Sequence, residues 1–285
     1  MSTRRTVKAR LYDPIFRWRN EHPGAQRVLH SINRVLRVSP PVRFRGWGMT
    51  TTHAPPWETG EREAQFRSSL QLAHALEFTG EAGISRATVD TLAWRHWFVT
   101  FAARHAVAAC RASDDILHAA EFGVADGTTA FFALRELTHA LPGDRVRFHL
   151  FDAWGAMRAD DLLPGEAIQG GRYANLSLEA TRRNLSPFDA LLTWHPGYVP
   201  ASLEEPGALP SSLSYVHIDL NAARPTYEVC RRVWPILAAG GVVLFDDYGW
   251  AGFEDTKRVV DGFALEVGAL VLTAPTAQAM LIKTR

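Results

Sequence analysis

From residue 116 onward, short runs of β-forming residues alternate with helical stretches. Strands that alternate with helices are joined by right-handed crossovers, which build a mostly parallel sheet with helices on both faces. Only residues 274–278 join the last two runs, too few for a helical crossover, so we expect those strands to pair antiparallel. The predicted strands are Ile116–Phe122, Arg147–Asp152, Phe188–Trp194, Tyr215–Leu220, Gly241–Asp246, Ala269–Thr273 and Ala279–Lys283. The predicted helices lie near 128–140, 177–185, 225–238 and 253–265.

The first 46 residues concentrate positive charge. They hold 11 Lys and Arg against two acidic residues, a net charge of +9, which leaves 20 basic and 28 acidic residues for the rest of the chain. Apolar residues recur at helical spacing among the arginines of this arm: Val28, Leu29, Ile32, Val35 and Leu36. We expect a helix that docks on its own protein or on a sister subunit, which favours a homo-oligomer. Peripheral contact with an anionic membrane is the second interpretation, and nucleic acid is the least favoured partner because no RNP-type motif or zinc finger is present.

Residues 47–114 separate the arm from the alternating region. Prolines in 46–57 block a regular helix or central strand, and helical patterns follow near 61–78 and 85–110. In the second pattern we place five apolar residues on or near one face: Val89, Leu92, Phe98, Phe101 and Ala102. The sequence thus predicts an arm over 1–46, a helical lid or cap over 47–114, and a ligand-binding domain over 115–285. His53 and Trp57 either close over a ligand with the lid or belong to a structural loop.

The cysteine content and the hydropathy pattern bear on the compartment. Cys110 and Cys230 lie far apart and are too few for a disulfide framework or a cysteine-rich zinc site. No apolar run approaches the roughly 20 residues that cross a bilayer, and no continuous apolar stretch follows the basic N-terminus as in a secretory signal. We expect a cytoplasmic protein, with membrane association through the basic arm as the alternative.

Ligands of open parallel sheets bind beyond the carboxyl ends of the strands. The first predicted strand runs into Glu121-Phe-Gly123-Val-Ala-Asp-Gly127-Thr128, where glycines let the backbone approach a ligand and the next helix offers free N–H donors. Asp152 ends the second strand, where a carboxylate can accept hydrogen bonds from two ribose hydroxyls. The spacing matches neither the Gly-x-Gly-x-x-Gly fingerprint nor a phosphate-binding loop. An ordinary strand-to-helix turn and a capping aspartate remain the alternatives.

The most informative feature is a set of carboxylates after two later strands. The fourth strand ends in His217-Ile-Asp219-Leu-Asn221 and the fifth in Phe245-Asp246-Asp247-Tyr248. Adjacent parallel strands would bring three carboxylates to one edge of the sheet, where like charges repel unless some are protonated or a cation neutralises them. Oxygen-only ligands suit Mg²⁺ or another hard divalent cation. The alternative is that these aspartates cap helices and face water.

Together these stretches resemble the macrocin-type (TylF-like) O-methyltransferases, class I enzymes that use S-adenosylmethionine (SAM). The matching stretches are Glu121–Gly127, Phe151–Asp152, His195–Pro200, His217–Asn221, Gly240–Gly249 and Ala274–Lys283. The resemblance implies a class I methyltransferase-like Rossmann fold over 115–285, with a seven-stranded, mostly parallel sheet whose last strand is antiparallel. It also implies that the substrate is a hydroxyl acceptor, commonly a sugar attached to a natural product.

The resemblance implies site residues one by one. Asp152 would bind the ribose of SAM, and the remaining cofactor contacts would be Glu121, Gly123, Gly127 and Thr128. The metal ligands would be Asp219, Asp246 and Asp247. Asn221 stands where relatives often carry an acid assigned as the general base; asparagine cannot take a proton, so that role passes to Asp219, to another group or to metal coordination. His195 follows the third strand and is either a catalytic candidate or a packing residue.

The sequence therefore predicts a SAM- and Mg²⁺-dependent O-methyltransferase acting on a sugar or another natural-product-like acceptor. One alternative is an NAD(P)-dependent oxidoreductase on a similar sheet, against which the missing third glycine of the dinucleotide fingerprint argues. The other is a non-catalytic scaffold whose basic arm binds a partner, against which the three retained aspartates argue.

Overall fold

A seven-stranded sheet organises the part of the chain that the computed structural model describes, residues 55–58, 60, 63–110 and 116–284. The strand order is β3-β2-β1-β4-β5-β7-β6. The strands β1 to β5 pair in parallel, and β7 pairs antiparallel with both β5 and β6, which confirms the predicted sheet and its closing strand pair. The strands are β1 Leu117–Phe122, β2 Val146–Asp152, β3 Leu192–Pro196, β4 Leu213–Ile218, β5 Leu237–Phe245, β6 Leu272–Thr273 and β7 Ala279–Ile282.

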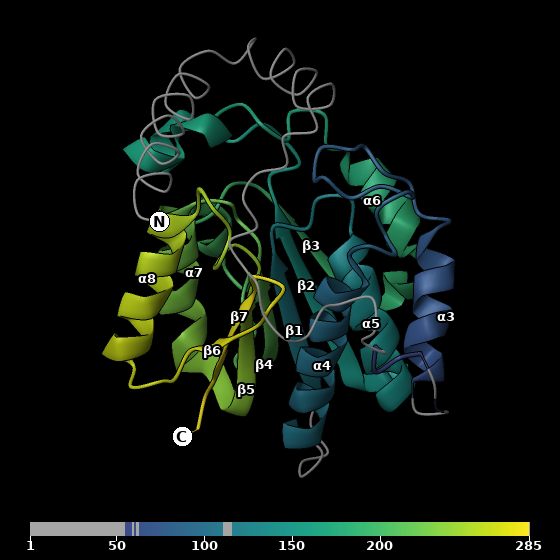
Figure 1. The fold of residues 1–285 in the computed structure, drawn as a ribbon. Helices are drawn as coiled ribbons and strands as arrows, with labels where there is room; N and C mark the ends of the chain where they lie inside the picture. The colour runs from purple at the N-terminus through teal and green to yellow at the C-terminus, as the bar shows by residue number, and fades with distance from the viewer. Residues whose placement is uncertain (1–54, 59, 61–62, 111–115, 285) are drawn as a thin grey trace, which may run out of the picture. The chain divides into compact units, whose positions relative to one another are not determined.

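Helices cover both faces of the sheet, as Figure 1 shows. The helices α3 to α6 lie on one side, and α7 and α8 lie on the other. Their bounds are α3 Ala64–Ala73, α4 Ala93–Cys110, α5 Thr128–Ala140, α6 Leu178–Leu185, α7 Ala223–Ile236 and α8 Glu254–Glu266. The four helices expected after residue 120 therefore form within two residues of their predicted bounds. The chain needs both layers because strands of a parallel sheet are apolar on both faces.

The α4 helix differs from its prediction in the face that it buries. Its fully buried residues recur at helical spacing: Val99, Ala102, Ala103 and Ala106. Phe101, which we expected on the buried side, is 47% exposed. The helix is apolar or aromatic on most of its circumference, so hydropathy alone does not select the side that packs. Small residues face the sheet because they let the helix approach α5 and β5 closely.

The third strand also differs from its prediction. Residues 186–191 form a short 3₁₀-helix, and β3 begins only at Leu192. Pro187 occupies the first turn of that helix, where its fixed φ is compatible and its missing N–H leaves no donor unpaired. Phe188 is buried as expected, but as part of this turn.

The 153–177 segment between β2 and α6 is closed at its base by backbone hydrogen bonds. Met157 N donates to the carbonyl of Arg172, and Gly171 N donates to the carbonyl of Met157, at 2.9 and 3.0 Å. Glu166, 1% exposed, accepts hydrogen bonds from the backbone N–H groups of Leu163 and Ala223 at 3.0 and 2.7 Å. Because Ala223 opens α7, this carboxylate ties the segment to the helix that follows the fourth strand.

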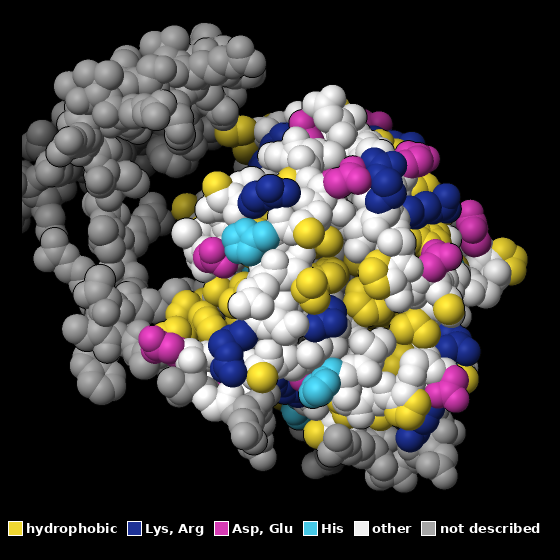
Figure 2. Space-filling view, turned by 90° about the vertical axis from the view of Figure 1, so that its right-hand side faces the viewer, with side chains coloured by type: hydrophobic (Ala, Val, Ile, Leu, Met, Phe, Trp, Pro, Cys, Tyr) yellow, Lys and Arg dark blue, Asp and Glu magenta, His cyan; other side chains and the backbone are white. Residues whose placement is uncertain are grey.

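Charges of both signs are interspersed on the described face turned to the viewer in Figure 2, on the side of α3. None of the helices in the described ranges combines the length and the hydropathy that crossing a bilayer requires. The basic arm over 1–46 and His53 lie outside the described residues. The three-part division of the chain, the homo-oligomer, the membrane contact and the cytoplasmic location stay predictions.

Trp57 and α4 form part of the same packed layer. The Trp57 ring lies 4.8 to 5.5 Å, centroid to centroid, from the rings of Phe66, Trp94 and Trp97. Pro56 onward belongs to the compact unit that contains the sheet. The described residues of the predicted lid thus act as a helical layer of the fold, and Trp57 is a packing residue.

Candidate active site

A cavity of about 490 Å³ opens at the carboxyl ends of the parallel strands. Its volume lies within the range of small-molecule and cofactor sites. Its wall comes from the loops after β1, β3, β4 and β5, from the 153–177 segment after β2, and from Arg95 of α4. Residues that line it include Gly123, Thr128, Thr129, Asp152, Arg158, Arg172, Tyr173, Asp219, Asn221, Asp246, Asp247 and Trp250. Parallel β/α crossovers place these loops together, although the first and the last of them lie more than 100 residues apart in sequence.

The loop from β1 to α5 forms one wall of the cavity. Gly123 has φ +86°, and a Cβ there would lie 1.9 Å from the backbone oxygen of Asp219, so no other residue fits without movement. Thr128 opens α5 and is 2% exposed, and its hydroxyl has no hydrogen-bond partner among the described residues. A buried, unpartnered hydroxyl at a helix N-terminus fits a polar ligand group. Gly127 is not among the lining residues; it lies against Thr181 and Leu185, so its role here is close packing with α6.

Asp152 lines the cavity at the end of β2 and braces the loop beside it. Its Oδ2 accepts the backbone N–H groups of Val124 and Ala125 at 2.7 and 2.8 Å. Its Oδ1 accepts the N–H of Trp154 at 2.6 Å. Burial raises the pKa of this carboxyl, and these three donors oppose that rise. The predicted ribose contact stays a prediction.

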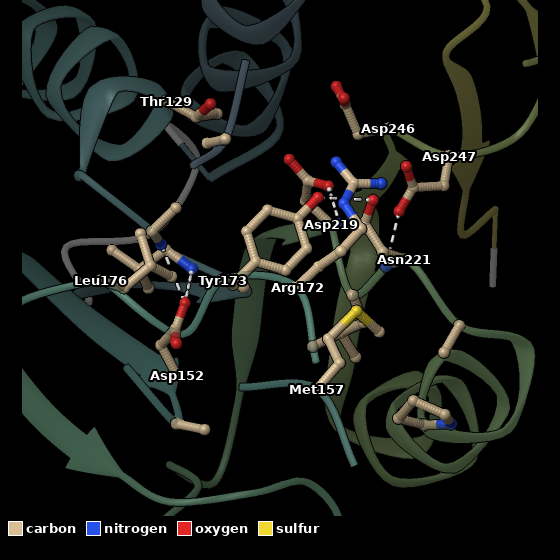
Figure 3. A pocket seen from close by; sticks show the side chains of 18 of the residues that line it. Thr129, Asp152, Met157, Arg172, Tyr173, Leu176, Asp219, Asn221, Asp246 and Asp247 are labelled. Atoms are coloured by element: carbon tan, nitrogen blue, oxygen red, sulfur yellow. Dashed lines mark hydrogen bonds between the residues drawn. The ribbon is translucent and has the colours of Figure 1, made fainter. Parts of the chain in front are cut away.

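Asp219, Asp246 and Asp247 converge on the opposite part of the cavity, as Figure 3 shows. One carboxylate oxygen from each lies within 4.8 Å of the others. Two oxygens on opposite sides of one Mg²⁺ or Ca²⁺ ion are about 4 to 5 Å apart, so the spacing fits a hard divalent cation. All three ligands would be carboxylate oxygens, the donor type that such cations prefer. These side chains meet because β4 and β5 are paired neighbours and Asp246 N donates to the carbonyl of Ile218.

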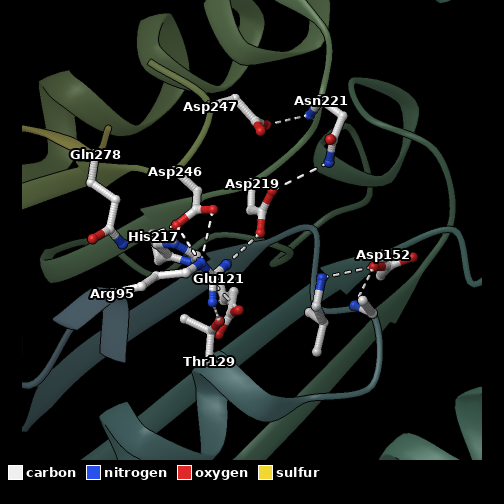
Figure 4. A network of polar contacts seen from close by, with 12 residues as sticks. Arg95, Glu121, Thr129, Asp152, His217, Asp219, Asn221, Asp246, Asp247 and Gln278 are labelled. Atoms are coloured by element: carbon white, nitrogen blue, oxygen red, sulfur yellow. Dashed lines mark hydrogen bonds and ion pairs between the residues drawn. The ribbon is translucent and has the colours of Figure 1, made fainter. Parts of the chain in front are cut away.

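Arg95 of α4 lies against this aspartate trio, Asp219, Asp246 and Asp247 (Figure 4). Its Nη2 donates to Asp219 Oδ2 at 2.9 Å, and its Nε lies 3.0 Å from Asp246. Gln278, in the turn before β7, donates its amide to Asp246 Oδ1 at 2.9 Å. Burial opposes ionisation of Asp246, but Arg95 and His217 hold its pKa well below the usual range. Burial raises the pKa values of Asp219 and Asp247, and repulsion within the trio adds to the rise.

Glu121 and His217 form a second charged layer beneath the trio. They face each other across β1 and β4, with His217 Nδ1 3.3 Å from Glu121 Oε1. Burial opposes protonation of His217, but Asp246 and Glu121 raise its pKa to about 9. With every group ionised, four carboxylates and two cations (Arg95 and His217) leave a formal charge of −2. A divalent cation would neutralise this set. Glu121 itself is absent from the cavity lining, so its predicted contact with the cofactor is not direct in this structure.

Asn221 links two of the aspartates to the 153–177 segment. Its side-chain amide donates to Asp219 Oδ1 at 3.2 Å, and its backbone N–H donates to Asp247 Oδ2 at 2.7 Å. Its carbonyl oxygen accepts the hydroxyl of Tyr173 at 3.0 Å. Asn221 and Tyr173 both have positive φ, 55° and 65°, a conformation that asparagine tolerates and that is rare for tyrosine. Asn221 therefore orients its neighbours.

His195 does not reach the cavity. Its ring stacks on Phe151 with centroids 4.2 Å apart, and its Nε2 lies 3.2 Å from His149 Nδ1. His149 in turn lies 3.3 Å from His118, so three histidines cross β1, β2 and β3 in a row. The catalytic interpretation of His195 is therefore replaced by the packing interpretation: its side chain points to the sheet face, while the strand end lies at the cavity.

The sequence did not identify three functional candidates. Arg95 stands in a run of aromatic residues, Trp94-Arg95-His96-Trp97, and a charged residue inside an apolar helix pattern is the signal that could have found it. Tyr173 lies in an irregular segment and Gln278 in a short turn, where no periodicity marks a side chain as buried. Their roles follow only from the contacts with Asn221 and Asp246.

Residues 120–248 match a family model described as a methyltransferase domain. A search of curated proteins finds no match. Among solved structures, the O-methyltransferase NovP is similar with a TM-score of 0.56 and 19% identity, over 67% of this chain and 80% of NovP. CalS11, a calicheamicin methyltransferase, is similar with a TM-score of 0.52 and 19% identity, over 84% of this chain and 98% of CalS11. These likenesses confirm the predicted class I methyltransferase-like Rossmann fold.

Proposed function

We propose that this chain is a SAM- and Mg²⁺-dependent O-methyltransferase that acts on a hydroxyl of a sugar or another natural-product-like acceptor. The premise is the match of residues 120–248 to a methyltransferase domain. The observation that carries the proposal is the convergence of three carboxylates on the wall of a cofactor-sized cavity. The name of NovP supports O-methylation, and the name of CalS11, a calicheamicin methyltransferase, supports a natural-product-like acceptor.

The β1–α5 loop and Asp152 are the part of the cavity that suits SAM. A bound SAM would supply an electrophilic methyl group. The N-terminus of α5 offers backbone N–H groups and the free hydroxyl of Thr128 to its carboxylate. Gly123 allows the close approach of the backbone, and Asp152 stands at the end of β2, where a carboxylate can accept hydrogen bonds from ribose hydroxyls.

Asp219, Asp246 and Asp247 are the residues that would hold Mg²⁺. A bound divalent cation would supply Lewis-acid stabilisation of the negative charge that develops on an acceptor oxygen. Burial and mutual repulsion oppose ionisation of Asp219 and Asp247 when no cation is bound, so a divalent cation would stabilise the ionised trio. Two side-chain amides, those of Gln278 and Asn221, donate to Asp246 and Asp219 and fix the directions of these carboxylates.

Asp219 is the proton acceptor that this arrangement favours. Asn221 cannot accept a proton, and its amide N–H already points to Asp219 Oδ1. Tyr173, whose pKa burial raises, stays a hydroxyl donor at the edge of the same space.

The test separates the cofactor, the metal and the acceptor. Calorimetry with S-adenosylhomocysteine, with and without Mg²⁺, measures cofactor binding, and formation of S-adenosylhomocysteine from SAM in the presence of nucleotide-linked sugars, glycosides and catechols measures turnover. We expect turnover with at least one sugar-bearing acceptor, its loss on chelation, and its recovery when Mg²⁺ is added back. Asp246→Asn should lower turnover at least 100-fold, while the matched variant Asp144→Asn, in a surface turn away from the cavity, should keep it.

Each contrary result removes a different part of the proposal. Full turnover in a buffer that contains a chelator would show that the reaction does not depend on a metal ion. Turnover with catechols but with no sugar-bearing compound would contradict the proposal that the acceptor is a sugar. Binding of NADH without binding of S-adenosylhomocysteine would favour the oxidoreductase alternative, and binding of neither would favour the scaffold.

A further inference from the structure

Arg95 brings a fixed positive charge into the aspartate trio. We propose that Arg95 is a positioning residue that holds Asp219 and Asp246 together from the inner side of the trio and weakens its affinity for a divalent cation. This inference rests on the metal site of the proposed function. It concerns a residue of α4, far in sequence from the strands that carry the aspartates.

The contacts of Arg95 are divided among three partners. Nη2 bonds to Asp219, Nε bonds to Asp246, and Nη1 donates to the hydroxyl of Thr129 at 3.0 Å. The guanidinium thus bridges the ends of β4 and β5 through one rigid, planar group. Among the hydrogen bonds of the described residues, none joins Arg95 to Asp247.

Several features keep Arg95 in this place. The residue is 9% exposed, so few water molecules can hydrate its guanidinium group. Thr129 lies in the first turn of α5, and α4 packs along α5 and β5, so the anchor of the third contact belongs to the core. Arginine does not lose its proton in proteins, so the guanidinium keeps its charge at this buried position. The guanidinium is therefore a permanent cation.

Asp246 already receives Arg95 and Gln278, whereas Asp219 and Asp247 keep more acceptor capacity for a second cation. Asp219 Oδ1 receives only the amide of Asn221, and Asp247 Oδ2 receives only the backbone N–H of Asn221. Arg95 itself lines the same cavity. With the three aspartates ionised, an added ion would approach a set whose formal charge Arg95 reduces from −3 to −2. Arg95 then has two effects: it preassembles the carboxylates, and it keeps metal binding weak enough to be reversible.

The charge of Arg95 predicts a change in metal affinity that misfolding would not produce. A neutral residue at position 95 should increase the affinity of the site for a divalent cation, whereas loss of structure would decrease it. The experiment measures binding of Mn²⁺ alone, by the disappearance of its free-ion resonance signal, with neither SAM nor acceptor present. We expect Arg95→Met to bind Mn²⁺ at least tenfold more tightly than the natural chain, because one unit charge a few ångströms away is removed. Arg95→Lys keeps the charge but loses the planar fork, so it should not bind Mn²⁺ more tightly than the natural chain.

A second neutral variant controls for the case in which Arg95→Met does not fold. Arg95→Gln keeps an amide donor toward the aspartates and should also bind Mn²⁺ more tightly, and Mn²⁺ should raise the melting temperature of both neutral variants more than that of the natural chain. Equal or weaker Mn²⁺ binding by both neutral variants would overturn the inference.

The outcomes distinguish the inference from the proposed function. Binding of Mn²⁺ by the neutral variants but not by the natural chain would support the role of Arg95 and contradict metal dependence of the natural enzyme. If none of the chains binds Mn²⁺ while all bind S-adenosylhomocysteine, the inference about Arg95 and the proposed metal site are both wrong. The proposal of a methyltransferase is then unaffected.

Discussion

Gly123 lies so close to Asp219 that a Cβ at position 123 would be 1.9 Å from the Asp219 carbonyl oxygen. Gly123 N donates to the carbonyl of Phe151, and Asp219 N donates to the carbonyl of Phe122, at 2.9 and 2.8 Å. The glycine loop after β1 is therefore wedged between the ends of β2 and β4. The loop proposed to hold the cofactor and the aspartate proposed to hold the metal are parts of one packed junction.

The first prediction concerns this junction. Gly123→Ala must move either the loop or Asp219, so we expect binding of S-adenosylhomocysteine and of Mn²⁺ to weaken together, each at least tenfold. Gly80→Ala is the matched control: Gly80 has a similar φ of +81°, but no atom lies within 4 Å of the point that its Cβ would occupy, so only the backbone strain of about 1 kcal/mol applies. Calorimetry on both variants checks the result. Loss of one ligand with full retention of the other would show that the two parts are independent.

The second prediction concerns the asparagine that replaces an acid. Asn221→Asp removes the donor to Asp219 and adds a fourth carboxylate, so without metal the free energy of unfolding should fall by about 1–3 kcal/mol. Mn²⁺ should restore stability to this variant more than to the natural chain. Urea unfolding in chelator and in Mn²⁺ measures both effects. Asn175→Asp is the control, because Asn175 also donates to a carboxylate, Glu81, but in an exposed pair, where the change should stay below about 1 kcal/mol.

The third prediction concerns the tie between the 153–177 segment and α7. Glu166→Ala leaves the N–H groups of Leu163 and Ala223 without their acceptor, and we expect the free energy of unfolding to fall by about 2–4 kcal/mol. Limited proteolysis should then cut within 153–177 faster than in the natural chain. Glu179→Ala, at an exposed position of α6, should change stability by less than about 0.5 kcal/mol. Unchanged proteolysis of Glu166→Ala would mean that other contacts hold the segment.

The fourth prediction is a loss of stability in mild acid. Burial, then His195 and His118, lower the pKa of His149 to about 4, while an unfolded histidine titrates near 6.5. A group whose pKa is lower in the folded state favours folding fully above the unfolded value, and that contribution is lost as the pH falls from about 6.5 toward 4. At pH 5 the loss from His149 amounts to roughly 1–2 kcal/mol, because partial solvent screening reduces the effect of the shift. Burial lowers the pKa values of His118 and His195 as well, so the three act in the same direction.

Chemical unfolding from pH 7.5 to pH 4.5 checks this prediction. His149→Phe keeps a flat ring between its two neighbours and should flatten the pH dependence of stability, whereas His139→Phe, at an exposed position of α5, should leave it unchanged. Identical pH profiles for the natural chain and His149→Phe would refute the role of the buried histidine row.

Much of the fold follows from local signals, and the errors have local causes. The alternation of strands and helices predicts the parallel sheet, and the short link 274–278 predicts the antiparallel end, because a crossover needs more residues than that. The third strand begins later than predicted because Phe188 satisfies the hydropathy pattern of a strand while Pro187 starts a 3₁₀ turn. The packed side of α4 was misassigned because large and small apolar residues compete on it, and only the distance to the sheet selects the small ones.

The sequence by itself determined that Asp219, Asp246 and Asp247 would meet, because each follows a strand of a parallel sheet and such ends share one edge. Only the tertiary structure decided what surrounds them. Arg95 reaches the trio from α4 and Tyr173 from an irregular segment, and neither position carries a periodic signal that points to the site. The physical reason is that hydropathy and spacing encode which backbone elements form, whereas the partner of a buried charge depends on how those elements pack in three dimensions.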